Sequence, residues 1–317
     1  MIGDELLERV EAGGLLAGPG SLVVMLSGGR DSVCVLDLAV RARGAEPVRA
    51  LHVNYGLRDE ADQDERHCAQ LCERLGAALE VERLRRPGGS GNLQAWAREA
   101  RYAAAARLAA EPGAAIVTGH TADDQVETIL YRLASSPSRR ALLGMRPREG
   151  RLVRPLLGTS REETTAYCEE QDLAWRDDAT NDGDAYARNR IRRGLVPELA
   201  RIHPAAKENV LRTAALLREE AELLDSLVDA ELAGGEGAEP GTIRHARFAE
   251  LPPALRRLVL QRLADEAAGR PVAGAARFAD QVAGLNRGGS TLDLGGNVRA
   301  VLERGILRAE LSQPPCI

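Results

Sequence analysis

The chain has 317 residues, 44% of them hydrophobic and 28% charged, with a formal net charge of −5, which predicts a globular protein of two domains. No run of about 18 uncharged apolar residues occurs and the N-terminal MIGDELLERVEAGG is acidic, so we exclude a membrane helix and a secretory leader and expect a cytoplasmic protein. Lys207 is the only lysine, which excludes a Walker A loop or a Schiff-base lysine in the N-terminal half. The five cysteines form no C-x-x-C pair, which suits neither a disulfide framework nor a zinc site and favours buried thiols.

Strand and helix patterns alternate through the first part of the chain. Strands are predicted at Leu22–Leu26, Val48–Asn54, Ala78–Leu84 and Ala114–Thr118, and helices at Asp31–Arg43, Glu60–Leu75, Leu93–Ala110 and Ala122–Leu133. This alternation is typical of an α/β, Rossmann-like fold, in which a parallel sheet carries helices on both faces. Because ligands of such folds bind at the carboxyl ends of the strands, we expect functional side chains just after each strand.

The pattern changes beyond residue 139, where loops and shorter helices lead to Pro204. We expect a domain boundary there, giving domains 1–204 and 205–317. An amphipathic helix is predicted at Ala205–Ala233, followed by a glycine-rich break and by helices at Leu251–Glu266 and about Ala275–Leu285. The tail reads as short strands, so the second domain is expected to be smaller and mainly helical.

The turn after the first predicted strand combines small residues with one acid. It reads Ser27, Gly28, Gly29, Arg30, Asp31 and Ser32, and a helix pattern follows at once. Unpaired backbone N–H groups and the helix dipole make such a turn an anion site. Asp31 would repel a phosphate unless a metal ion lies between them, which implies Mg²⁺ at Asp31. On its glycines alone, the turn also fits an ordinary strand-to-helix connection.

The whole hexad resembles the S-G-G-x-D-S loop of the N-type ATP pyrophosphatases, or PP-loop proteins, which share the adenine nucleotide α-hydrolase-like fold. The resemblance implies that ATP is a substrate, cleaved between its α and β phosphates so that AMP passes to a substrate oxygen. It also implies the ATP-binding residues, which are Ser27, Gly28, Gly29, Arg30, Asp31, Ser32, His52 and Asn54.

Further blocks resemble the tRNA(Ile)-lysidine synthetases. They read HVNYGLR (52–58), GNLQAWAREARY (91–102), GHTADDQVET (119–128), RPLLGTSR (154–161), WRDDATN (175–181) and RNRIR (188–192). The chain departs from the family at Tyr55, at Gln94, to which we assign no role, and at LASSPSRRALLGM (133–145), which replaces a glycine-rich loop. That last departure leaves a tRNA contact in this loop open.

Asp124 and Glu127 fall on one face of the helix predicted from Ala122, because residues three apart lie side by side. Carboxylates on a surface helix are often only solvated. At the carboxyl end of a sheet that also carries an ATP-binding loop, they form a candidate binding site for a cationic amine. The resemblance implies that Asp124 and Glu127 are catalytic with Asp31 and bind lysine, together with Arg98 or Arg101. His120 receives no catalytic role.

Two basic stretches stand out in this acidic chain. Residues 138–161 hold seven arginines against one glutamate, and residues 185–201 hold five against one. Arginine reads phosphate and splayed bases well, although each of these arginines also fits a structural ion pair. The resemblance implies tRNA binding by Arg154, Arg188, Asn189, Arg190 and Arg192.

The reaction implied by the resemblance joins L-lysine to C2 of cytidine 34 in the CAU anticodon of tRNA(Ile), with ATP and Mg²⁺. We expect no membrane contact, and a homodimer is one of the assembly states left open. The alternatives are a cytidine thiolase of the same loop class and a non-catalytic ATP-binding RNA scaffold. The absence of C-x-x-C disfavours the first, and three acids around a phosphate site disfavour the second.

Overall fold

The computed structural model describes residues 2–56, 61–84, 93–136, 139–176, 187–233, 239–285 and 289–312. Some residues of the motifs above lie outside these ranges, namely Leu57, Arg58, Gly91, Asn92, Pro137, Ser138, Asp177, Asp178, Ala179, Thr180 and Asn181. The chain forms two compact units, Met1–Ala215 and Leu216–Ile317. The division falls inside the helix α10 (Ala206–Leu232), C-terminal to Pro204.

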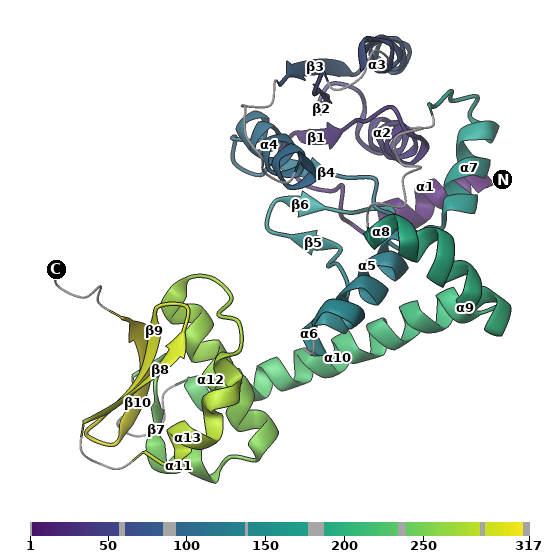
Figure 1. Ribbon diagram of the computed structural model, residues 1–317. Helices are drawn as coiled ribbons and strands as arrows, with labels where there is room; N and C mark the ends of the chain where they lie inside the picture. Colours follow the sequence, from purple (N-terminus) through teal and green to yellow (C-terminus); the bar gives the residue numbers. More distant parts are fainter. Residues whose placement is uncertain are drawn as a thin grey trace. The chain divides into compact units, whose positions relative to one another are not determined.

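The first unit is built on a sheet in which, among the described residues, six strands are ordered β3-β2-β1-β4-β6-β5. The strands are β1 (Leu22–Met25), β2 (Val48–Asn54), β3 (Ala78–Arg83), β4 (Ala115–Val117), β5 (Arg148–Glu149) and β6 (Leu152–Val153). All neighbours pair in parallel except β5 and β6, which are antiparallel. The predicted parallel sheet is confirmed, and the short β5–β6 pair extends it (Figure 1).

The central strand β1 shows why this sheet needs helices on both faces. Successive side chains of a strand point to opposite faces. Leu22 and Val24 pack into one core, with side chains of α2 (Arg30–Arg43) and α3 (Ala61–Leu75). Val23 and Met25 pack into another, with side chains of α4 (Leu93–Leu108). All four are buried. An apolar run without alternation therefore becomes a strand that is covered on both sides.

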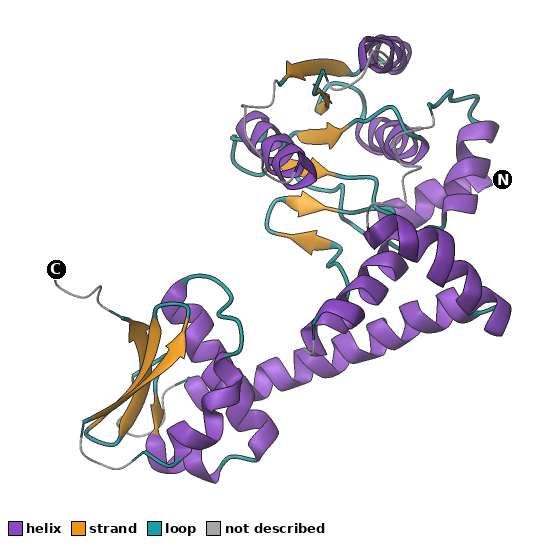
Figure 2. Ribbon diagram, viewed as in Figure 1, coloured by secondary structure: helices purple, strands orange, loops and turns teal. Residues whose placement is uncertain are grey.

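Helices follow the strands as the sequence predicts (Figure 2). In the first unit they are α1 (Ile2–Ala12), α2 (Arg30–Arg43), α3 (Ala61–Leu75), α4 (Leu93–Leu108), α5 (Ala122–Ser135), α6 (Arg139–Leu142), α7 (Arg161–Glu170), α8 (Ala187–Arg190), the π-helical turn η2 (Ile191–Leu195) and α9 (Val196–Ile202). The helix α1 was not predicted, and it packs Leu6 and Val10 into the same core as α2.

The second unit combines helices with a small antiparallel sheet, as expected. Its elements after α10 are β7 (Ile243–Arg244), α11 (His245–Glu250), α12 (Pro253–Ala268), η3 (Ala275–Phe278), α13 (Ala279–Ala283), β8 (Ser290–Gly295), β9 (Val298–Glu303) and β10 (Ile306–Leu311). The sheet order is β7-β10-β9-β8. Its core includes Phe248, Leu260 and Leu307, all fully buried.

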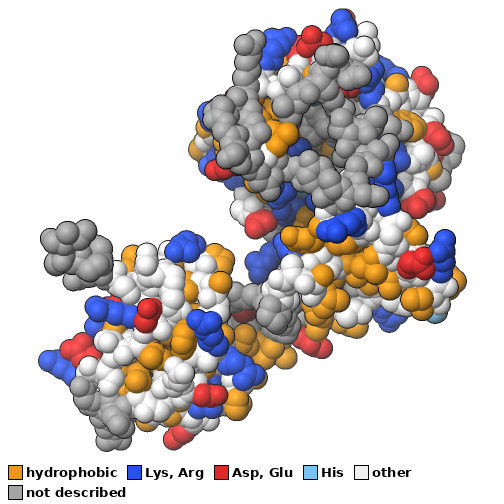
Figure 3. Space-filling model, in the orientation of Figure 1, with side chains coloured by type: hydrophobic (Ala, Val, Ile, Leu, Met, Phe, Trp, Pro, Cys, Tyr) orange, Lys and Arg blue, Asp and Glu red, His pale blue; other side chains and the backbone are white. Residues whose placement is uncertain are grey.

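Apolar side chains also reach the surface of the first unit. Figure 3 shows a group of them near α9, where Leu195 and Ile202 are exposed. Within the described residues, every helix is too short or too polar to cross a bilayer. We assign this exposed apolar surface no role.

Candidate active site

The loop between β1 and α2 is held by its own serines. The Ser32 hydroxyl donates to the carbonyl oxygen of Gly29 (2.7 Å) and accepts from the Ser27 amide (3.2 Å), and Ser27 Oγ accepts from the Gly29 amide (3.3 Å). Gly28 has a φ of 85°, a conformation that favours glycine. The loop thus leads directly into the N-terminus of α2, where unpaired N–H groups and the helix dipole attract an anion.

Asp31 lies in the first turn of α2 and is tied to α7. The Thr164 hydroxyl donates to Asp31 Oδ1 (2.6 Å), which also accepts from Arg30 Nε (3.2 Å). Arg161 Nε lies 3.9 Å from Asp31 Oδ2. The side chain of Asp31 is 21% exposed, so its carboxylate remains open to the cleft described below.

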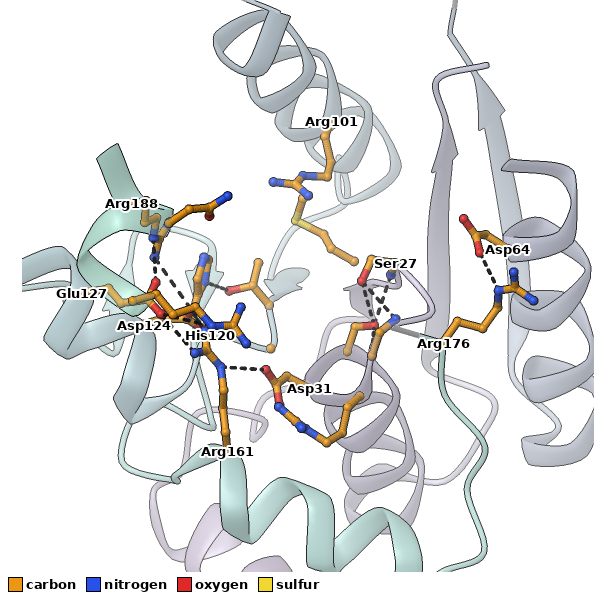
Figure 4. A pocket seen from close by; sticks show the side chains of 18 of the residues that line it. Ser27, Asp31, Asp64, Arg101, His120, Asp124, Glu127, Arg161, Arg176 and Arg188 are labelled. Atoms are coloured by element: carbon orange, nitrogen blue, oxygen red, sulfur yellow. Dashed lines mark hydrogen bonds and ion pairs between the residues drawn. The ribbon is translucent and has the colours of Figure 1, made fainter. Parts of the chain in front are cut away.

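Asp124 and Glu127 stand on one face of α5, as predicted, and point toward the same space (Figure 4). Asp124 Oδ2 accepts from the backbone amide (3.0 Å) and the hydroxyl (3.2 Å) of Thr121, so it caps the helix that carries it. Glu127 is only 4% exposed. A carboxylate buried to this extent needs a cationic or hydrogen-bonding partner.

The partners are arginines from later in the chain. Arg161 places Nη2 2.8 Å from Asp124 Oδ1 and Nη1 3.0 Å from Glu127 Oε1. Arg188 places Nε 3.2 Å from Glu127 Oε2, and Arg192 Nε lies 4.0 Å from Glu127 Oε1. Burial would lower the pKa of the Arg161 guanidinium, but the Asp124 and Glu127 carboxylates raise it above its usual value. The two acids are therefore already neutralised by guanidinium groups.

His120 lies beside this cluster and is neutral at pH 7. Its Nδ1 is 2.7 Å from Thr118 Oγ1. Burial lowers the pKa of His120 to about 4; the Asp124 carboxylate opposes the shift, and Arg154 and Arg188 add to it. The ring can exchange hydrogen bonds with a ligand without adding a positive charge.

These groups face one cleft, with a volume of about 830 Å³. Predicted site residues that line it are Ser27, Gly29, Arg30, Asp31, Ser32, Arg101, Asp124, Glu127, Arg188, Asn189 and Arg192. Of the two arginines considered for lysine, Arg101 lines the cleft and its Nε has no hydrogen-bond partner among the described residues. Arg98 does not line the cleft, and both arginines lie over the Tyr102 ring, with Cζ 4.9 Å (Arg98) and 6.0 Å (Arg101) from its centroid.

Other predicted residues have partners elsewhere. His52 Nδ1 lies 3.0 Å from the Leu26 carbonyl oxygen. Asn54 donates to Asp62 and Glu65 of α3. These two predicted ATP ligands do not line the cleft.

Some of the residues predicted to bind tRNA line the cleft, and others do not. Arg154 is buried and donates to the Arg146 carbonyl oxygen (2.6 Å) and to Glu149 (3.1 Å). Arg190 is exposed and is not a lining residue. Arg188, Asn189 and Arg192 do line the cleft, so this part of the predicted tRNA surface lies beside the carboxylates.

The sequence reasoning gave no role to several residues that line the cleft. They are Asp64, Thr118, Arg161, Arg176 and Arg193. Arg161 had a detectable signal, because Ser160 and Glu163 form a capping box that starts α7 at Arg161. Arg176 Nε donates to Asp64 Oδ1 (2.7 Å), and the Arg176 amide donates to the Gly28 carbonyl oxygen (3.0 Å). No local pattern marks the Arg176–Asp64 contact.

No group of three or more His, Cys, Asp or Glu within the described ranges is placed to hold a metal ion. Asp31 is a single carboxylate at the phosphate loop. Mg²⁺ usually keeps several waters and is held by one or two carboxylates together with substrate phosphates. The donor set therefore fits a magnesium ion that arrives with a nucleotide.

The chain is similar to known proteins over most of its length. Residues 5–199 match the model of the PP-loop domain family. The chain is 41% identical over 264 residues to the tRNA(Ile)-lysidine synthase of Thermus thermophilus, covering 81% of this chain and 51% of that protein. It is 37% identical over 336 residues to the synthase of Symbiobacterium thermophilum, covering 98% and 69%. The chain thus spans about half the length of the first of these relatives.

A solved structure is similar in fold. The U34-tRNA thiolase of Methanococcus maripaludis superposes with a TM-score of 0.58 at 17% identity, covering 68% of this chain and 79% of the thiolase. At this identity the similarity concerns the fold of the chain alone.

Proposed function

The chain belongs to the tRNA(Ile)-lysidine synthase family and contains a PP-loop domain, and from this premise we propose that it joins L-lysine to C2 of cytidine 34 in the CAU anticodon of tRNA(Ile), converting ATP to AMP and diphosphate. One observation carries the proposal. The carboxylates Asp124 and Glu127 line the same cleft as the phosphate loop, Ser27–Ser32. A cationic amine and a nucleotide can therefore meet there.

In the first step, the C2 carbonyl oxygen of cytidine 34 attacks the α-phosphorus of ATP and diphosphate leaves. The backbone N–H groups of the loop and of the start of α2 bind the phosphate oxygens. Mg²⁺, held by Asp31 and those oxygens, would offset the negative charge of the diphosphate. Preorganised donors of this kind contribute several kcal/mol to a transition state.

In the second step, the ε-amino group of lysine loses a proton and attacks C2 of the adenylated base, which expels AMP. Asp124 and Glu127 bind the ammonium form before it reacts. Of the two arginines that hydrogen-bond Glu127, Arg188, with 45% of its side chain exposed, is replaced by an incoming amine more easily than Arg161, which is only 17% exposed. Arg101 borders the same cleft and completes the proposed lysine site.

The anticodon loop is proposed to enter beside the segment 187–195. This segment carries Arg188, Asn189, Arg190 and Arg192 on α8 and the π-helical turn η2. Such turns occur frequently at functional sites. We further propose that residues 1–204 act as the catalytic domain and 205–317 as the tRNA-binding domain, in the cytoplasm.

Four of the five thiols, those that lie in the described residues, weigh against a cytidine thiolase. Cys34, Cys68, Cys72 and Cys168 are buried. Burial raises the pKa of the Cys68 thiol to about 12 and that of Cys72 to about 11. Sulfur transfer needs an accessible thiolate or a bound cluster. The lysine reaction needs neither.

The test incubates the full chain with ATP, Mg²⁺, labelled L-lysine and a CAU-anticodon tRNA, and measures label in RNA and release of AMP. We expect incorporation that is lost in Asp31→Ala and reduced in Asp124→Ala. Asp4→Ala, which removes an exposed carboxylate of α1, is the matched control and should keep wild-type activity. Release of ADP, or AMP without labelled RNA, contradicts the proposal, and a scaffold releases no AMP.

A further inference from the structure

Arg161 contacts all three carboxylates of the proposed reaction. Its side chain lies between α2 and α5, with the three guanidinium nitrogens directed at Asp31, Asp124 and Glu127 (Figure 4). The contacts differ in length. Those to Asp124 (2.8 Å) and Glu127 (3.0 Å) are hydrogen bonds, whereas the Asp31 contact (3.9 Å) is a longer ion pair.

Arg161 is itself fixed at the start of α7. Its backbone amide donates to Asp123 Oδ2 (2.9 Å). Ser160 and Glu163 form the capping box that begins the helix. With 17% of its side chain exposed, the guanidinium has little freedom to leave. Arg161 is therefore held in one position between the phosphate loop and the helix α5, which carries Asp124 and Glu127.

Asp124 and Glu127, the two proposed lysine-binding carboxylates, depend on the contact with Arg161 to different degrees. Asp124 keeps a second anchor, because its Oδ2 accepts from Thr121. Glu127 has Arg188 on Oε2, and this arginine is the one that the amine replaces. When Arg188 moves away, Arg161 remains the buried contact of Glu127.

We infer that Arg161 is a positioning residue for lysine transfer, holding Asp124 and Glu127 so that the amine is aligned with the adenylated base at the phosphate loop. This inference rests on the proposed function above. Arg161 donates to the carboxylates, not to the reacting atoms, so its effect reaches the chemistry through them. Its planar guanidinium presents a separate nitrogen to each carboxylate in a fixed geometry, whereas an ammonium group has only one nitrogen for both.

The test compares two half-reactions of the full chain carrying Arg161→Gln. Adenylation is measured without lysine, as tRNA-dependent exchange of labelled diphosphate into ATP, and transfer as labelled lysine entering tRNA. We expect kcat for transfer to fall about 100-fold, since small misplacements of reacting groups cost that much, while adenylation changes no more than about threefold. The KM for lysine should not rise, because the substitution removes a cation from a cation-binding cluster.

Two further variants sharpen the result. Arg161→Lys restores the charge without the fork, and we expect it to recover about tenfold of the lost transfer rate. Arg9→Gln is the matched control, since Arg9 pairs with Glu163 of the same helix end at an exposed site and should behave as wild type.

Each alternative outcome has a distinct meaning. If adenylation and transfer fall together, or if the KM for lysine rises while kcat is kept, Arg161 does not act by positioning. If Arg161→Gln matches Arg9→Gln, the inference is wrong although the lysine reaction stands. If the wild type incorporates no lysine, the proposed function itself fails.

Discussion

Gly119→Ala should separate the phosphate loop from the helix that carries the carboxylates. Gly119 follows β4, and a Cβ placed on it would lie 2.5 Å from the Asp31 carbonyl oxygen, 2.7 Å from the Asp31 carbonyl carbon and 3.0 Å from the Ser32 amide nitrogen. These are backbone atoms, so no side chain can turn away. An ordinary contact needs about 3.4 Å or more, so Gly119 and the first turn of α2 must move apart by roughly 1 Å.

The expected cost has two parts. Overpacking of this kind destabilises by about 1–3 kcal/mol. In a unit of this size each kcal/mol lowers Tm by roughly 2–4 °C, so about 2 kcal/mol gives a decrease of about 4–8 °C. A 1 Å displacement at reacting groups costs about 100-fold in rate. Thermal unfolding and lysine incorporation into tRNA measure the two effects.

Gly158→Ala is the matched control. Gly158 is exposed, and an added Cβ there would meet nothing within 4 Å. Loss of glycine entropy from the unfolded chain should leave this variant unchanged or more stable by about 0.4–1 kcal/mol. If Gly119→Ala and Gly158→Ala have the same Tm and the same activity, the close approach of β4 to the phosphate loop is wrong.

Two further predictions concern the charges of the cleft. Glu127→Gln removes one charged hydrogen bond to the substrate ammonium, worth about 1.5–3 kcal/mol, so the KM for lysine should rise about 10- to 150-fold while diphosphate exchange is kept; an unchanged KM would place the amine elsewhere. The pKa of His120 is about 4 when folded and 6.5 in the reference state, so the unfolded chain binds a proton first and stability is lost as pH falls from 6.5 toward 4. Between pH 7 and pH 5 this proton binding lowers the free energy of unfolding of the wild type by about 2 kcal/mol. Denaturant titrations at the two pH values should show a loss smaller by about 2 kcal/mol in His120→Gln, because glutamine does not bind the proton.

The sheet was predictable because its signal is local. The uninterrupted apolar run at β1 and the alternation of strands with helices predict a parallel sheet, whereas the order of its strands comes from the structure. The pair β5 and β6 escaped prediction because two-residue strands show no period. The helix α1 was not predicted, although its buried Leu6 and Val10 are four residues apart and so lie on one helix face.

Some site residues were placed at the correct strand end but not in the cleft. His52 and Asn54 are two apart on β2, so both side chains take the same face of the sheet. That face meets α3, where Cys68 contacts His52 and where Glu65 contacts Asn54. A motif position alone does not determine which face of a strand its side chain takes.

The arginines around Asp124 and Glu127 could not be predicted by spacing. Arg161 and Arg188 lie more than 30 residues beyond these acids. The sequence shows these arginines only as members of two basic stretches, for which nucleic-acid binding was predicted. The structure adds that Arg161, Arg188 and Arg192 also face carboxylates of the first unit.

This pairing resolves a conflict between the two proposed substrates. The carboxylates that line the cleft, Asp31, Asp64, Asp124 and Glu127, would together attract an ammonium ion and repel a triphosphate. Arg161 is buried and fixed, so it offsets part of that charge permanently, whereas Arg188 is half exposed and can yield its place to an amine. The cleft can therefore accept ATP while its carboxylates are neutralised and still offer them to lysine. Guanidinium groups suit this arrangement because they remain charged when buried and span two acids at once.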